Sequence, residues 1–468
     1  MEPVIEHLSG QPAFGPALYD ITALGYKLDE YTFEGRAQNY LADDHLSADT
    51  DRREMVIREE PYKSRFIVVL PKDMATFNGT VIVEWMNVTG GLDVPVVWVN
   101  AHREIMRKGY GYVAVSAQKV GIDGGTSRSQ GTANPLKAMD PSRYASLSHP
   151  GDAFCFDIFS DVARVLRGVR AREIFGSLSP LVLLAAGESQ SAIYLTTYVN
   201  IVDPDSKLYD GFLIHSRVAT AAPLGNMSIF EAPAAWGEQV VRISPSLRVP
   251  VVQVVTETDV IRLGHMTGFH AARQPDGEKL RTWEIAGSAH ADNYLFGVGM
   301  IDAPGVPIEQ LAKAWSPLSE IKGMQLANPI NNGPQHHYVI EAAIRHLDEW
   351  VKLGIEPPHA DNLEVLAETP SRLKTDRHGN AIGGVRTPWV DVPISQLTGD
   401  PILSKNDLAG MVVPFGRSLL EELYPAGRVQ YVGRFKASLD EAIANGFILQ
   451  DDREEILQLA EMAFPMHI

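Results

Sequence analysis

Residues 181–198 read LVLLAAGESQSAIYLTTY. An apolar run typical of a buried strand stops at Gly187, and an apolar pattern typical of a helix resumes after Ser191. The residues between them are small or polar, and Ser189 stands in the middle. Such a segment is either an ordinary strand-to-helix turn or a turn that presents a serine side chain. The rest of the chain has to distinguish these two interpretations.

Further short apolar runs indicate strands of the same kind. They lie at 65–71, 80–86, 111–117, 209–216, 249–257 and 282–287. Their Val, Ile and Leu residues are continuous rather than alternating, which is typical of strands covered on both faces. Helical patterns lie between most of them, at 101–109, 151–169, 191–202 and 334–354. This alternation predicts an α/β fold with a mostly parallel central sheet and helices on both faces.

Two stretches fall outside the alternation. Residues 217–248 are rich in Ala and Pro, and their hydrophobic residues show neither helical nor strand periodicity. They lie between two predicted strands, so we expect a small cap insertion over the sheet. Residues 360–468 mix loops with late helical stretches, and we expect a C-terminal extension packed on the core. A small separate domain is the alternative for this extension. The predicted core then comprises residues 1–359.

The composition is that of a globular protein. Of 468 residues, 45% are hydrophobic and 21% charged, which permits a sizeable core. The formal net charge of −17 argues against nucleic acid or an anionic membrane surface as a partner. The single cysteine, Cys155, allows no internal disulfide. No signal peptide or membrane-spanning run is evident, so we expect a cytoplasmic protein, although a processed secreted form would look the same. The composition leaves homo-oligomer formation open.

The serine turn has the composition of a nucleophile elbow. In a sharp strand-turn-helix, the side chain at the apex points away from the sheet, and small residues must flank it. Gly187 and Ser191 meet this requirement, although Ser191 is larger than the glycine of the usual G-x-S-x-G pattern. The N–H of Gln190, at the helix start, can donate to a developing oxyanion. The pattern therefore favours Ser189 as a nucleophile.

A base and an acid follow later in the chain, each just after a predicted strand. His290 follows TWEIAGSA, and Thr256-Glu257-Thr258-Asp259 follows VVQVV. The order serine, acid, histidine is the one that an α/β-hydrolase fold requires. Asp259 fits the usual distance past the strand and is preferred, with Glu257 as the alternative. The sequence thus predicts a triad of Ser189, His290 and one of these two acids.

A second oxyanion donor is expected in the loop after the strand at 80–86. Two glycines in Asn87-Val88-Thr89-Gly90-Gly91 let the backbone approach a ligand closely. The N–H of Asn87 or Val88 is the predicted donor, unless the loop is only a flexible connection. The chain contains no phosphate-binding glycine motif. It also contains no metal-ligand spacing, at the adjacent His336 and His337 or elsewhere. No metal and no organic cofactor are therefore expected.

Several stretches resemble a family of bacterial proteins described as alpha/beta hydrolase domain proteins. They are VEWMNVTGGLD (83–93), DPSRYASLSHPGD (140–152), AAGESQSAIYL (185–195), DGFLIHSR (210–217), VVTETDV (254–260), EIAGSAHAD (284–292) and EWVKLGIEPP (349–358). The resemblance spreads over nearly the whole chain and implies the α/β-hydrolase fold. It also implies Ser189 as nucleophile, His290 as base and Asp259 or Glu257 as acid. It suggests carboxylic ester hydrolysis without naming an ester.

The predicted function is therefore that of a serine esterase, a carboxylic ester hydrolase acting on a small molecule through an acyl-enzyme. Acyl transfer to an alcohol or amine is the first alternative, because the sequence does not show which nucleophile reaches the acyl-enzyme. A hydrolase-like binding protein without turnover is less favoured, since all three residue types of a triad are present. Phe230, Trp236, Trp389 and Phe415 are candidates to line an apolar substrate pocket, although each is equally explained as core.

Overall fold

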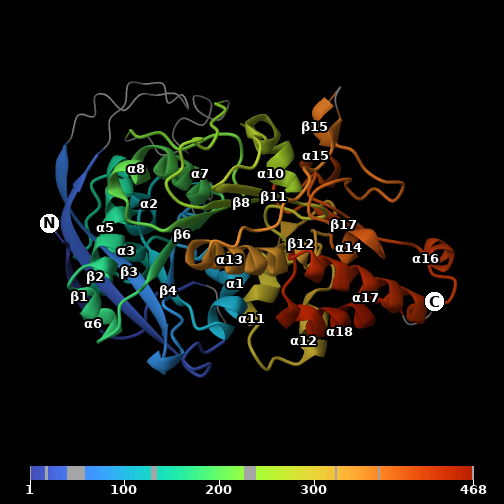
Figure 1. The fold of residues 1–468 in the computed structure, drawn as a ribbon, viewed down its shortest axis with the longest axis horizontal. Helices are drawn as coiled ribbons and strands as arrows, with labels where there is room; N and C mark the ends of the chain where they lie inside the picture. The colour runs from blue at the N-terminus through green and yellow to red at the C-terminus, as the bar shows by residue number, and fades with distance from the viewer. Residues whose placement is uncertain are drawn as a thin grey trace.

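The computed structural model describes residues 2–15, 19–39, 58–127, 134–225, 239–321, 324–366 and 369–465. Within these residues the largest sheet has nine strands, in the order β1-β2-β3-β5-β4-β6-β7-β8-β11 (Figure 1). Their bounds are Val4–Leu8, Tyr26–Gln38, Glu59–Pro71, Gly111–Val115, Thr80–Trp85, Val182–Glu188, Gly211–His215, Val251–Thr256 and Leu280–Ile285 in that order. The strands from β5 to β11 pair in parallel, and β1, β2 and β3 extend one side in antiparallel fashion. The predicted mostly parallel sheet is confirmed.

Helices cover both faces of this sheet. One face packs against α5 (Cys155–Arg167) and α7 (Gln190–Thr197). The other face packs against α1 (Val96–Arg107) and α13 (Gln335–Leu353). Because successive strand residues point to opposite faces, Val83 and Trp85 of β4 belong to the first cluster and Ile82 to the second. This two-sided burial explains the continuous apolar runs in the sequence.

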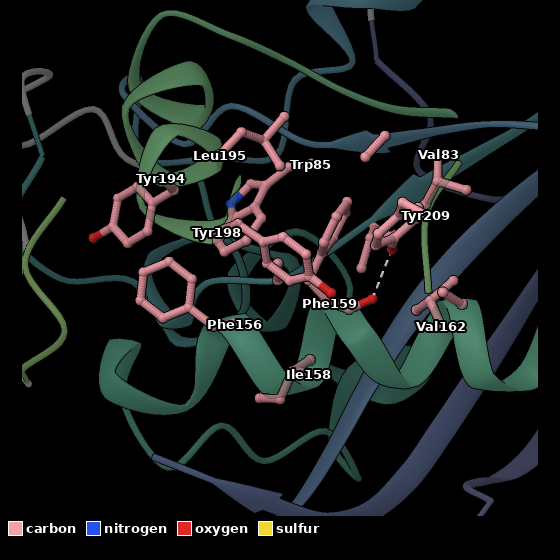
Figure 2. Packing of buried hydrophobic residues seen from close by; sticks show 14 of the residues in the cluster. Val83, Trp85, Phe156, Ile158, Phe159, Val162, Tyr194, Leu195, Tyr198 and Tyr209 are labelled. Atoms are coloured by element: carbon pink, nitrogen blue, oxygen red, sulfur yellow. Dashed lines mark hydrogen bonds between the residues drawn. The ribbon is translucent and has the colours of Figure 1, made fainter. Parts of the chain in front are cut away.

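Aromatic rings fill the first of these faces (Figure 2). The indole of Trp85 lies 4.9 Å from the ring of Phe159 and 5.3 Å from that of Tyr194, measured between centroids. The Tyr209 hydroxyl donates to the main-chain oxygen of Phe159 at 2.9 Å. Buried aromatic pairs at such distances add to the stability that burial of their area provides. The packing fixes α5 and α7 against the strands that lead into the serine turn.

The strands β1 and β2 are absent from the sequence prediction, and for β2 buried charge is the reason. Glu30 of β2 is fully buried, and its carboxylate accepts from Arg65 of β3 at 2.6 Å and from the Nε of Arg143 at 2.7 Å. Charged residues at these positions suggest an exposed segment when the sequence alone is read. Paired and hydrogen-bonded charges can nevertheless be buried, which is how β2 joins the sheet.

Shorter elements connect the main ones. The helices are α2 (Lys119–Asp123), α3 (Leu136–Met139), α4 (Pro141–Tyr144), α6 (Ala171–Phe175), α8 (Asp203–Ser206), α10 (Glu257–Ile261), α11 (Gly299–Ile301), α12 (Ile308–Ala314), α14 (Pro388–Asp391), α15 (Pro401–Ser404) and α16 (Arg417–Leu423). Small antiparallel pairs are β9 (Arg262–Leu263) with β10 (Met266–Thr267), β12 (Glu320–Ile321) with β13 (Met324–Gln325), β14 (Val365–Leu366) with β15 (Thr369–Leu373), and β16 (Ser395–Thr398) with β17 (Met411–Pro414). No helix within the described ranges combines the length and apolar character that a membrane crossing requires.

The C-terminal helices α17 (Arg428–Ala444) and α18 (Arg453–Ala463) lie beside the end of the sheet that carries β11 (Figure 1). Arg103 of α1 donates to Glu455 of α18 at 2.9 Å, and the Tyr338 hydroxyl of α13 donates to the same carboxylate at 2.8 Å. These contacts attach the C-terminal chain to helices of the sheet. The domain boundary between residues 359 and 360 stays a prediction.

The predicted cap, residues 217–248, is only partly described. Residues 226–238, and with them Phe230 and Trp236, lie outside the described residues. In the remainder, the N–H of Ala219 donates to Thr267 at 3.0 Å, and the N–H of Val241 donates to Ala219 at 2.8 Å. A cap over the sheet therefore stays a prediction.

Candidate active site

The turn at Ser189 joins the end of β6 directly to the start of α7. Ser189 has φ 59° and ψ −118°, a backbone conformation that residues other than glycine rarely adopt. A Cβ added to Gly187 would lie 3.0 Å from the Cδ1 of Leu195 and 3.0 Å from the Cβ of Ser191. The strand and the helix thus approach so closely that a larger residue at position 187 would force its neighbours to shift by a few tenths of an ångström.

The structure brings Ser189, His290 and Asp259 together. Ser189 Oγ lies 2.8 Å from Nε2 of His290, and Nδ1 of His290 lies 2.6 Å from Oδ1 of Asp259. The three residues follow β6, β11 and β8 and are 7%, 5% and 0% exposed, respectively. The carboxyl ends of parallel strands meet at one edge of the sheet, so loops distant in sequence converge there. The arrangement can pass a proton from a hydroxyl to an imidazole that a carboxylate orients.

Glu257, the alternative acid, has different partners. Its Oε1 accepts from the N–H of Gly287 at 2.6 Å, and its Oε2 accepts from the N–H of Gly399 at 2.8 Å and the hydroxyl of Thr398 at 3.0 Å. Burial raises the pKa of Glu257 to about 7. The carboxyl joins the start of α10 to the loop that carries His290 and to the end of β16. The geometry therefore favours Asp259 as the partner of His290.

The loop after β4 differs from the expectation for an oxyanion site. The N–H of Asn87 donates to Val94 at 3.0 Å, and the N–H of Val88 donates to the side-chain Oε1 of Gln190 at 3.1 Å. The Nε2 of Gln190 donates in turn to Gln118 at 3.0 Å. Both predicted main-chain donors are thus engaged within the protein. The main-chain oxygen of Val94 accepts one of them, and the side chain of Gln190 accepts the other. The N–H of Gln190 lies at the first position of α7, where a helix offers it no acceptor.

Glu188 is a site residue that the sequence analysis did not select. Its side chain is buried, and its Oε1 lies 3.6 Å from Nε2 of His290. Asn87 Nδ2 donates to Glu188 twice, at 3.2 Å to the main-chain oxygen and at 3.3 Å to Oε2. Burial raises the pKa of Glu188 to about 7, with a smaller opposing effect from His290. The sequence signal that could have identified Glu188 is its position directly before the predicted nucleophile, Ser189.

A second imidazole and carboxylate pair lies behind the turn. His336 Nδ1 is 3.2 Å from Oδ2 of Asp292, and its Nε2 is 2.7 Å from Nε2 of His215. The main-chain oxygen of His215 accepts the N–H of Ser189 at 2.9 Å. His337 points elsewhere and stacks on Tyr294. In the part of the chain that the structure describes, no group of three or more His, Cys, Asp or Glu side chains could hold a metal ion.

An apolar cavity of about 360 Å³ lies between the C-terminal residues and the segment that precedes α13. Trp315, Trp389 and Phe415 contribute its aromatic lining. Neither Ser189 nor His290 lines this cavity. The cavity is therefore not the space in which Ser189 would meet a substrate.

Comparison with known proteins gives one family match. A family model described as "Alpha/beta hydrolase domain" matches residues 2–458. No curated protein sequence matches the chain.

Similar solved structures include esterase Est22, with 14% identity, coverage of 50% of this chain and 64% of that chain, and a TM-score of 0.27. An α/β serine hydrolase without a lid from Xanthomonas campestris gives 12% identity, 48% and 78% coverage, and a TM-score of 0.28. A thermostable esterase from Pseudomonas putida gives 11% identity, 52% and 66% coverage, and a TM-score of 0.27. The chain thus spans less than two-thirds of the length of Est22 and of the Pseudomonas esterase.

Proposed function

Because the chain belongs to the alpha/beta hydrolase domain family, we propose that it is a serine hydrolase that cleaves carboxylic esters through an acyl-enzyme. The observation that carries the proposal is the continuous hydrogen bonding from Ser189 Oγ through His290 to Asp259. The strained backbone at Ser189 supports it, since strain of this kind gathers at functional turns.

In the proposed acylation, Nε2 of His290 takes the hydroxyl proton as Ser189 Oγ attacks the ester carbonyl carbon. Asp259 keeps the Nδ1–H of His290 directed toward itself and stabilises the imidazolium. His290 then gives the proton to the leaving alcohol. A water molecule next attacks the acyl carbon, with His290 again as base, and releases the carboxylic acid and free Ser189.

The proposed oxyanion donors are the N–H groups of Gln190 and Val88. The Gln190 N–H stands at the N-terminus of α7, where the helix dipole also favours negative charge. To bind the Val88 N–H, a substrate oxygen would have to replace the Oε1 of Gln190. Asn87 is left out of the oxyanion site because its N–H pairs with Val94.

The cytoplasmic location and a small-molecule ester as substrate stay predictions. Two other functions remain as alternatives. Acyl transfer uses the same triad with an alcohol or amine in place of water. A binding protein without turnover would keep the fold but leave Ser189 unreactive.

Labelling with a fluorophosphonate, followed by peptide mass spectrometry, tests the proposal. Stoichiometric modification at Ser189 is expected, with loss of labelling in His290→Ala and in Ser189→Ala. A panel of p-nitrophenyl esters would then identify the preferred acyl group. Absence of labelling in folded protein, or modification of a different serine, would contradict the proposal.

A further inference from the structure

A carboxyl group lies beside the nitrogen of His290 that faces Ser189. Glu188 Oε1 is 3.6 Å from Nε2, the same nitrogen that lies 2.8 Å from Ser189 Oγ. The opposite ring nitrogen already has Asp259 at 2.6 Å. The imidazole therefore has a carboxyl oxygen near each of its two nitrogens. The catalytic steps proposed above use Asp259 and leave Glu188 without a task.

The carboxyl of Glu188 is held in one orientation. Glu188 is the last residue of β6, so its backbone is fixed by the sheet. Asn87 Nδ2 donates to Oε2, which turns Oε1 toward His290. A separation of 3.6 Å is too long for a direct hydrogen bond. It is a separation that one water molecule can bridge by donating one hydrogen to each group.

We propose that Glu188 positions the water that hydrolyses the acyl-enzyme, and thereby selects water over alcohols as the second nucleophile. The inference rests on the serine hydrolase function proposed above. The water donates one hydrogen to Nε2 of His290 and the other to Oε1 of Glu188. An alcohol carries a single hydroxyl hydrogen, so it cannot donate to both groups at once. Glu188 thus favours hydrolysis of the acyl-enzyme over transfer of the acyl group to an alcohol.

The step balances without a net proton change on Glu188. The water oxygen forms a bond to the acyl carbon as Nε2 of His290 takes the first proton. The tetrahedral intermediate then breaks its bond to Ser189 Oγ, and Nε2 returns the proton to that oxygen. The second water hydrogen leaves in the carboxylic acid product. Glu188 orients the attacking lone pair and accepts only a hydrogen bond.

The variant Glu188→Gln tests this role because it replaces the hydrogen-bond acceptor Oε1 with a donor. Asn87 Nδ2 needs an acceptor, so it holds the glutamine carbonyl oxygen at the Oε2 position. The glutamine NH₂ then replaces Oε1 and cannot accept a hydrogen bond from water. With p-nitrophenyl acetate, we expect an acylation burst like that of the wild type. Steady-state turnover should fall about 10- to 100-fold, as for other losses of reactant positioning.

A competition with methanol measures the selection itself. In Glu188→Gln the ratio of methyl acetate to acetic acid should rise, and intact mass spectrometry should show accumulated acyl-enzyme. Glu188→Ala, which also lacks the acceptor, should raise the ratio as well. Glu84→Gln is the matched control, since Glu84 is an equally buried glutamate on the neighbouring strand β4 whose carboxylate accepts from α1.

The outcomes separate the inference from the proposed function. A wild-type ratio in Glu188→Gln, or an equal fall of burst and turnover, would overturn the role of Glu188 while leaving the serine hydrolase in place. Absence of a burst in the wild type would overturn the function and this inference with it. A raised ratio confined to the Glu188 variants, with Glu84→Gln unchanged, supports the positioning of water.

Discussion

Asp259 contacts His290 with one carboxylate oxygen and is anchored by the other. Oδ1 lies 2.6 Å from Nδ1 of the imidazole, while Oδ2 accepts from the N–H and the hydroxyl of Thr256 at 2.8 and 2.7 Å. With both oxygens engaged, the carboxylate keeps one orientation. It therefore favours the imidazole tautomer that leaves Nε2 free to accept from Ser189.

Asp259→Asn should abolish most of the activity. The Thr256 N–H holds the amide oxygen of the asparagine, so its NH₂ faces Nδ1 and favours the wrong tautomer of His290. We expect kcat for a p-nitrophenyl ester to fall by about 10⁴-fold with little change in the melting temperature. A decrease of less than tenfold would mean that another acid orients His290.

Glu257→Gln should affect stability more than catalysis. The glutamine NH₂ would face one of the N–H donors of Gly287 and Gly399, leaving a buried donor unpaired. The free energy of unfolding in urea should fall by about 1–3 kcal/mol, while kcat stays within a few-fold of the wild type. If kcat instead falls as far as in Asp259→Asn, Glu257 belongs to the triad.

Ser189→Gly should be more stable than Ser189→Ala. Glycine adopts the φ of 59° without steric cost, whereas alanine keeps the strain of the native turn. Relief of about 1–3 kcal/mol of strain outweighs the greater flexibility of glycine in the unfolded chain. Thermal denaturation of the two variants checks this. Both should resist fluorophosphonate, and a lower melting temperature for the glycine variant would show that the turn is unstrained.

Gly187→Ala should disturb the turn itself. The added Cβ would lie 3.0 Å from Leu195 and from Ser191, so these neighbours must shift by a few tenths of an ångström. We expect a loss of about 1–3 kcal/mol in unfolding free energy and slower labelling of Ser189. Gly433→Ala in α17 is the control, because its Cβ would meet nothing within 4 Å. Equal stability of the two variants would contradict the close approach.

The stability should depend on pH through buried carboxyl groups. Burial raises the pKa of Glu84 from an ordinary value of 4.5 to about 8. Between these values the folded protein retains a proton that the unfolded chain has released, so the free energy of unfolding falls as pH rises. Glu188 and Glu257, with pKa raised to about 7, act in the same direction.

Glu84→Gln should remove its own share of that slope. The glutamine does not titrate, so the difference in unfolding free energy between about pH 5 and about pH 8 should be smaller than in the wild type. Urea denaturation at the two pH values measures it. A difference as large as in the wild type would show that Glu84 is ionised in the folded protein.

The sequence alone determined the parallel strands of the sheet and the three loops that meet at their carboxyl ends. Continuous apolar runs are a local property, and so is the small-residue turn that contains Ser189. Once strands are parallel, their carboxyl ends share an edge, so the chain order of Ser189, Asp259 and His290 was enough to bring their loops together. The strand β2 was not predicted, because its charged Glu30 suggests an exposed segment. Glu30 is buried in the fold through its pairing with Arg65 and Arg143, and the local sequence pattern does not reveal such pairing.

Only the tertiary structure decided which of the neighbouring polar groups meet. Glu257 and Asp259 lie two residues apart, yet one pairs with Gly399 and the other with His290. Asn87 was expected to donate its N–H to an oxyanion, but Val94 takes that N–H and the side chain holds Glu188 instead. A buried polar group pairs with whichever partner the packed backbone places within about 3 Å, and that distance is unrelated to separation along the chain.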